Sequence, residues 1–391
     1  MKNQLLKSGL GIHRQIQLRS LLALVLIVGI SPLAMFGCSD NAPKTYAVKN
    51  WDEVQTNIDN AKSSDSLDLS GLTTPATKYT LSIPANINLK IIGNPNEIFI
   101  GVAIVCDGTN VITIENLHLI STNNQAASTI YFNGWGNQLI LVGQNSVINA
   151  QALRMPGCGA AIGVQDGATI TISGDGSLTA QGGSSGAGIG GGADRSAGTI
   201  TIREGTIIST GGNLGMSTGG AGLGGGENGA GGTVTISGGT VSLVGGGSAA
   251  GLGGGSGGSG GNVSISGGKI NTEGGNMAAG IGGGSGGSGG VVNISGGDVV
   301  ARAGNQASGL GRGVGGESST LNITNGTLTA YGTPGAERAD AIGGRVDTLP
   351  ARYVWWAADQ FIDPASVPGI AYPEDEFIDN GGLYFVRIEA R

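Results

Sequence analysis

The most regular feature of the chain is a set of short segments in which apolar residues alternate with polar ones. Typical examples are Val263-Ser264-Ile265 and Ile270-Asn271-Thr272. An alternation with a period of two predicts β-strands that bury one face. None of these segments has the ten or more periodic residues that a helical repeat would need. The pattern therefore favours an all-β protein.

These segments recur at a constant spacing. One column of apolar residues contains Leu223, Leu252, Ile281 and Leu310, each 29 residues after the previous one. Two more columns run beside it, Ile172, Ile202, Ile236, Ile265, Ile294 and Ile323, and Leu178, Ile207, Val241, Ile270, Val299 and Leu328. Three strands per repeat, stacked about 4.8 Å apart, predict a parallel β-helix of about ten coils over residues 65–345.

Charged residues occupy equivalent positions in successive repeats. Lys269 and Asp298 are 29 residues apart, and so are Glu273 and Arg302. Side chains at equivalent positions of neighbouring coils lie next to each other on the surface, so we expect two opposite-charge pairs.

Both ends of the stack have sequences suited to covering a bare strand edge, which would otherwise invite aggregation. In residues 38–64, Trp51, Val54 and Ile58 are spaced for one face of a helix. Residues 346–391 are rich in aromatic residues and contain two strand-like segments, 352–357 and 383–389. We expect an N-terminal helical cap and a small C-terminal β cap.

The first 37 residues have the composition of an export signal. Four basic residues and no acidic one precede an apolar stretch, Leu21 to Ile30, that is too short to span a bilayer. The sequence Met35-Phe36-Gly37-Cys38 then resembles a bacterial lipoprotein signal with Cys38 as the lipidated residue, although Met35 replaces the usual Leu. An ordinary cleaved signal peptide is the alternative. Both kinds of signal predict a location in the cell envelope, outside the cytoplasm. The protein would be lipid-anchored in the first case and secreted in the second, and a lipid anchor would be its only contact with the membrane.

Composition supports a stack of coils and excludes one class of partner. Gly accounts for 79 of 391 residues, and it suits tight corners between closely packed coils. Removal of residues 1–37 changes the net charge from −7 to −11. Because phosphate binding requires basic patches, we expect no nucleic acid partner.

The predicted cap helix and stacked coils resemble the pectin-lyase-like superfamily of right-handed parallel β-helices. The repeated sequences AGIGGG and TISGG are similar to those of bacterial cell-surface proteins with glycine-rich β-helix repeats. The resemblance covers most of the mature chain, but its motifs are of low complexity. It implies the fold and leaves several functions open, since polysaccharide lyases, glycoside hydrolases, adhesins and carbohydrate binders share it.

No catalytic motif of these enzymes is complete. Arg154-Met155-Pro156 begins the R-x-P-x-x-R pattern of one lyase family, but Gly159 stands where the last Arg should be. His118 is the only His of the mature chain, and its position between two leucines predicts a surface location on a strand.

Metal and thiol chemistry are also poorly supported. The glycine repeats lack the Asp of calcium-binding solenoid repeats, so we expect neither a cofactor nor a metal, although a single Ca²⁺ site elsewhere stays open. Cys106 and Cys158 lie about two coils apart, too far for a disulfide, which predicts two buried free thiols.

Two places remain as candidates for ligand contact. Trp135 lies between two glycines at a corner, where an exposed indole could stack on a sugar ring. A polar patch departs from the Gly/Ser consensus, and its members are Asp194, Arg195, Arg203, Glu204 and Glu227.

These observations favour a monomeric surface protein that binds polysaccharide or a cell-surface glycan, or mediates adhesion, without catalysis. A polysaccharide lyase or glycoside hydrolase is one alternative, and a structural stalk is another.

Overall fold

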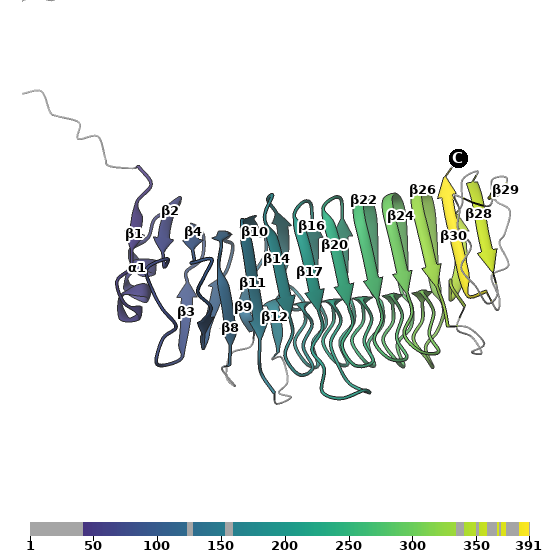
Figure 1. Cartoon of the computed structure of the whole chain (residues 1–391), viewed down its shortest axis with the longest axis horizontal. Helices are drawn as coiled ribbons and strands as arrows, with labels where there is room; N and C mark the ends of the chain where they lie inside the picture. The colour runs from purple at the N-terminus through teal and green to yellow at the C-terminus, as the bar shows by residue number, and fades with distance from the viewer. Residues whose placement is uncertain are drawn as a thin grey trace, which may run out of the picture. The chain divides into compact units, whose positions relative to one another are not determined.

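The computed structural model describes residues 42–122, 128–152, 159–333, 340–348, 352–357, 366, 369–372 and 383–390. Residues 43–391 form one compact unit. Its body is a parallel β-solenoid in which the strands of successive coils lie side by side (Figure 1). The predicted all-β, parallel β-helical fold is therefore confirmed.

One side of the solenoid is a nine-stranded sheet with one short strand from each coil. Its strands are β3 (Tyr79–Ile83), β6 (Val102–Asp107), β9 (Ser128–Asn133), β12 (Ala160–Gly163), β15 (Ile189–Gly190), β18 (Leu223–Gly224), β21 (Leu252–Gly253), β23 (Ile281–Gly282) and β25 (Leu310–Gly311). The described part thus has fewer coils than the ten or so that the sequence suggested. Beyond β25, Ile342 forms only an isolated bridge with Leu310, and no strand of this sheet precedes β3.

The rest of each coil belongs to a broad sheet that contains two parallel ladders. The first ladder consists of β1 (Thr45–Ala47), β2 (Asp65–Asp68), β4 (Asn88–Ile92), β7 (Val111–Glu115), β10 (Asn137–Val142), β13 (Thr169–Ser173), β16 (Thr199–Ile202) and β19 (Thr233–Ile236). The second consists of β5 (Phe99–Ile100), β8 (His118–Ser121), β11 (Gln144–Asn149), β14 (Ser177–Gln181), β17 (Thr206–Thr210) and β20 (Thr240–Val244).

In the last three coils the two ladders join into single long strands. These are β22 (Asn262–Glu273), β24 (Val291–Arg302) and β26 (Ser319–Tyr331). A register shift follows Ile265 and Ile294, where Gly268 and Gly297 adopt positive φ angles of 89° and 88°. The Ser-Gly-Gly sequence, which looked like a corner between strands, is therefore a bulge within one strand.

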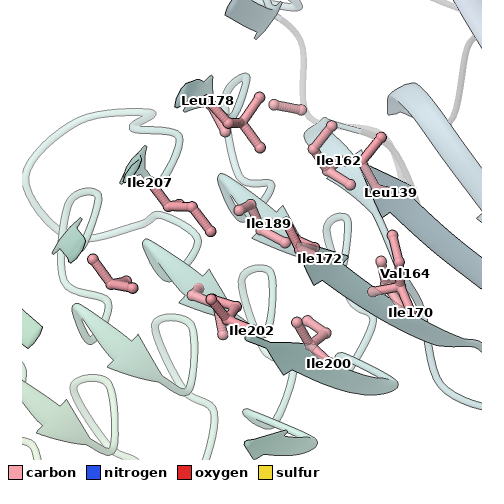
Figure 2. Packing of buried hydrophobic residues seen from close by; sticks show 14 of the residues in the cluster. Leu139, Ile162, Val164, Ile170, Ile172, Leu178, Ile189, Ile200, Ile202 and Ile207 are labelled. Carbon is pink, nitrogen blue, oxygen red and sulfur yellow. The ribbon is translucent and has the colours of Figure 1, made fainter. Parts of the chain in front are cut away.

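The apolar columns expected from the sequence form the core. Ile172 and Ile202 are register partners in β13 and β16, and both are fully buried. Ile189 of the nine-stranded sheet is buried too, and it lies near them inside the coils (Figure 2). Each coil thus buries aliphatic side chains from both sheets against those of the next coil.

Glycine at the coil corners has a steric cause. Gly224, Gly253 and Gly282 have φ angles of 137°, 135° and 134°, a region that essentially only glycine populates. A Cβ on Gly253 would lie 2.1 Å from the carbonyl oxygen of Gly282 in the next coil. These glycines are thus required for the close stacking of coils, whatever the protein binds.

Both ends of the described stack are covered. At the N-terminal end, η1 (Trp51–Glu53) and α1 (Val54–Asn60) bury Trp51, Val54 and Ile58, and the Trp51 ring packs 5.1 Å from the Phe99 ring. At the other end β27 (Gly344–Thr348) pairs parallel with β26. β28 (Arg352–Ala357) pairs antiparallel with both β29 (Ile370–Tyr372) and β30 (Phe385–Ala390), and β30 also pairs antiparallel with β26. The two expected caps are present, with β29 as an additional strand.

Candidate functional site

Trp135 lies at the corner between β9 and β10, and its side chain is the most exposed aromatic one in the described part of the chain. The residue is 72% exposed. Its carbonyl oxygen accepts a hydrogen bond of 2.7 Å from the Thr109 hydroxyl of the preceding coil. The next backbone N–H, from Gly136, donates to the Thr169 hydroxyl of the following coil at 2.6 Å. The backbone of this turn is thus held by both neighbouring coils while the indole faces solvent.

Two buried asparagines fix the same corner from inside. Asn110 and Asn137 are each 1% exposed and occupy equivalent positions in adjacent coils. The Asn137 amide donates to the Gly134 carbonyl at 3.0 Å, and its Oδ1 accepts the Asn110 backbone N–H at 2.9 Å. The Asn110 amide donates in turn to the Asp107 carbonyl at 2.8 Å. A buried polar pair with satisfied hydrogen bonds makes the corner rigid.

Polar residues of two adjacent coils lie at the same corner as Trp135. Asp107 and Asn133 are register partners at the ends of β6 and β9, and both are exposed. Thr109 is exposed as well. We call the group Asp107, Thr109, Asn133 and Trp135 the tryptophan corner. It combines one aromatic face with a carboxylate, an amide and a hydroxyl, which are the groups that usually contact sugars.

The sequence pointed to Trp135 but not to the residues that support it. Asn110 and Asn137 are 27 residues apart, in coils whose sequences do not otherwise repeat. The signal that would have identified them is an asparagine at the last position of a Gly-containing corner in both coils. The two corners are Asp107-Gly108-Thr109-Asn110 and Gly134-Trp135-Gly136-Asn137.

The second predicted site is split between two corners. Asp194 and Arg195 are exposed in a turn before β16, where Asp194 Oδ1 accepts a hydrogen bond of 2.8 Å from the Asn228 amide. Arg203 and Glu204 are exposed after β16. A strand of four residues, about 13 Å long, separates these two pairs.

Glu227 departs from the expectation of an exposed polar patch. It is only 9% exposed, and its backbone N–H donates to the Ser185 carbonyl at 2.8 Å. Its own carbonyl accepts the N–H of Asp194 at 2.7 Å. Glu227 is therefore part of the packing between coils at a Gly-rich corner, although its local sequence does not indicate burial.

That corner repeats through the stack as a series of β-turns. Asp194 and Asn228 have φ angles of 58° and 60°, and glycines with φ of 81° take the equivalent position in the next three coils, Gly257, Gly286 and Gly315. Asx residues tolerate this left-handed conformation better than other residues with side chains. The residue type at Asp194 is thus explained by turn geometry without any ligand.

The other titratable groups offer little chemistry. Cys106 is a buried free thiol, and burial raises the pKa of this thiol far above its usual range. His118 lies in β8 between the buried Leu117 and Leu119, as expected, and partial burial lowers the pKa of its imidazole. Within the described ranges, no three His, Cys, Asp or Glu residues are grouped closely enough to hold a metal ion.

Four sequence features lie outside the described residues. They are the export signal of residues 1–37, Cys38, the lyase-like Arg154-Met155-Pro156 and Cys158. Lipidation of Cys38 and the free state of Cys158 therefore remain predictions. Among the helices that the structure describes, none has the length and apolar character needed to cross a bilayer.

No protein-family model, no curated protein and no solved structure matches the chain.

Proposed function

We propose that the protein is a non-catalytic carbohydrate-binding protein of the cell envelope, and that the tryptophan corner contacts the glycan. The observation that carries this proposal is the 72% exposure of Trp135 on a turn that both neighbouring coils hold in place. The apolar face of an exposed and rigidly held indole can stack on the apolar face of a sugar ring.

The rigidity of the corner supports recognition rather than simple exposure. A ligand that binds a mobile loop must first order it, whereas the buried Asn110 and Asn137 have already ordered this turn. Asp107 and Asn133 lie beside the turn and supply hydrogen-bond acceptors and a donor for sugar hydroxyls. Because the mature chain carries a net charge of −11, neutral glycans are favoured over acidic ones.

The test is binding of residues 39–391 to a panel of plant, host and bacterial polysaccharides. Trp135→Ala should weaken binding about tenfold, or about 1.4 kcal/mol, and Trp135→Phe should lose less. Met216→Ala is the matched control, because Met216 is a large apolar residue, 78% exposed, on another corner. This control should bind like the unmodified chain.

The same mixtures are assayed for new reducing ends and for unsaturated products. Release of either product would overturn the non-catalytic part of the proposal and favour a lyase or hydrolase. Equal loss of binding in Trp135→Ala and Met216→Ala would remove the tryptophan corner as the site. Absence of binding to every polysaccharide would favour the structural stalk.

A further inference from the structure

A groove runs past the ends of the three long strands β22, β24 and β26, far from the tryptophan corner. Its volume is about 410 Å³, and the residues that line it include Glu273, Asn276, Asn305, Thr333 and Tyr384. The remaining wall is glycine backbone and Ala303. Ligand pockets usually measure about 300–1,000 Å³, so this groove has room for one or two sugar rings.

The floor of the groove is built from stacked turns with fixed side chains. The Asn305 amide donates to Oδ1 of Asn276 at 3.0 Å, one coil away. The Thr333 hydroxyl donates to the Gly304 carbonyl at 2.8 Å, and the Ala278 N–H closes the turn at Gly275 with a bond of 3.1 Å. The Asn276 amide, the Asn305 amide and the Thr333 hydroxyl thus lie in a row on three successive coils.

This arrangement leaves hydrogen-bonding groups available to a ligand. Among the described residues, Nδ2 of Asn276, Oδ1 of Asn305 and the Glu273 carboxylate have no protein partner. Glu273 was expected to pair with Arg302, and the two are indeed register partners. The Arg302 guanidinium, however, donates to Asn271 Oδ1 at 2.7 Å and lies 4.9 Å from the Tyr331 ring centre.

An aromatic wall completes the groove. Tyr384 lines it and is half-buried, and its ring lies 6.1 Å from the Tyr331 ring. Tyr331 packs in turn against Phe385, 5.4 Å away, where β30 pairs with β26. Tyr384 is therefore supported from behind and offers a firm apolar surface next to the row of amides.

We propose that this groove binds a neutral sugar unit, with the amides of Asn276 and Asn305 and the Glu273 carboxylate on its hydroxyls and Tyr384 against its ring. Amide donors and acceptors beside a carboxylate match vicinal hydroxyls, each of which can donate and accept. An anionic sugar is disfavoured because it would face Glu273. The proposal shares its ligand class with the proposed function but uses different residues.

The two sites can be tested separately because they are well apart. Trp135 precedes β10 in the third coil, whereas the groove begins after β22 in the seventh. Four coils at about 4.8 Å each place them about 20 Å apart along the axis.

The experiment measures binding of small sugars to residues 39–391 by saturation-transfer NMR and calorimetry. The probes are glucose, galactose, mannose, N-acetylglucosamine, cellobiose, lactose and galacturonate. The test variant combines Asn276→Ala with Asn305→Ala. Its matched control combines Asn293→Ala with Asn322→Ala, because Asn322 donates to Asn293 at 2.8 Å in the same kind of pair, on a strand face outside the groove.

We expect at least one neutral sugar to bind, the test variant to lose this binding, and the control and Trp135→Ala to keep it. Galacturonate should bind several-fold more weakly than galactose, which has the same ring without the carboxylate. The proposal is wrong if no neutral sugar binds, if the control loses as much as the test variant, or if galacturonate binds more tightly. If only Trp135→Ala lost small-sugar binding, and the Asn276→Ala/Asn305→Ala variant kept it, the sugar would be bound at the tryptophan corner instead of the groove.

Discussion

Gly253 shows how a single residue type controls the stacking of coils. Its φ of 135° is closed to residues with a side chain, and the carbonyl oxygen of Gly282 occupies the space that a Cβ would need. Gly282 has the same relation to Gly311, with a φ of 134°. The carbonyl of each coil thus fits under the α-carbon of the previous one.

Gly253→Ala should therefore lower the free energy of unfolding by about 2 kcal/mol or more, through backbone strain and the clash with Gly282. The control is Gly71→Ala, since a Cβ there meets nothing within 4 Å. That substitution should change stability by less than about 0.5 kcal/mol. Chemical denaturation followed by circular dichroism measures both. Equal stability of the two variants would contradict the steric role of the glycine column.

The burial of individual residues could be predicted where the same residue type recurs in successive coils, and not where it does not recur. The glycine columns and the inward isoleucines repeat in register, so their burial could be predicted. The exposure of Trp135 was expected from its two glycine neighbours, whereas the burial of Asn110 and Asn137 was not recognised, although an asparagine ends the corner in both coils. Glu227 occupies a position that is Ser in the next coil, Ser256, and nothing in its local sequence indicated that the turn packs inward.

Among the structural elements, the start of the solenoid depends on one carboxylate. Asp65 begins β2, and its side chain accepts backbone N–H bonds from Lys44 at 2.7 Å and Lys62 at 2.8 Å. Asp65 thereby holds two backbone segments against β2: Lys44, which precedes β1, and Lys62, which follows α1. These hydrogen bonds to the ionised form lower the pKa of Asp65 below its ordinary value.

A carboxyl group with a lowered pKa stabilises the folded state above its unfolded pKa, about 3.9, and loses this effect as the pH falls through the folded pKa. Asp65→Asn should therefore unfold more easily than the unmodified chain at pH 7. The difference should shrink as the pH falls below about 4. Thermal unfolding at several pH values checks this, with the exposed Asp175→Asn as control. A difference that is independent of pH would point to packing rather than charge.

The strands themselves were predictable as apolar columns, but their lengths were not. Ser266, Gly267 and Gly268 have the composition of a corner, and in the earlier coils the chain does break between the two ladders. In β22 the bulge at these residues keeps the backbone hydrogen-bonded to the next coil, so the strand continues. Whether Ser-Gly-Gly ends a strand or bends it depends on its neighbours in space.

For the whole molecule, the period of the sequence predicted the fold class, and additional elements cover both ends of the described stack. The caps could be recognised because their composition differs from that of the repeats. The groove at Glu273 could not be foreseen, because it combines three coils with Tyr384 from beyond the repeats. No repeated residue pattern indicates a function in the same way. The function is therefore a proposal that depends on the two proposed sites and the experiments that test them.

Removal of the C-terminal cap should make the protein aggregate. A chain that stops at residue 343 lacks β27 and β30 and leaves the edge of β26 unpaired. Unpaired edges of parallel sheets pair readily with other chains. Size-exclusion chromatography with light scattering should show large species for this truncation and a monomer for residues 39–391. A monomeric truncation would show that the edge is protected in another way.

The in-register stacking of similar 29-residue units has a genetic consequence. Each unit contacts only the coil before it and the coil after it, so one more copy could be inserted between β18 and β21 without altering either cap or the groove. Every added copy would lengthen the protein by about 4.8 Å and move the tryptophan corner and the groove apart by the same step. Unequal recombination between the similar repeat sequences would therefore change the spacing of the two proposed sites in steps of one coil, and variants of different length would differ in the glycan spacing that these proposed sites could bridge.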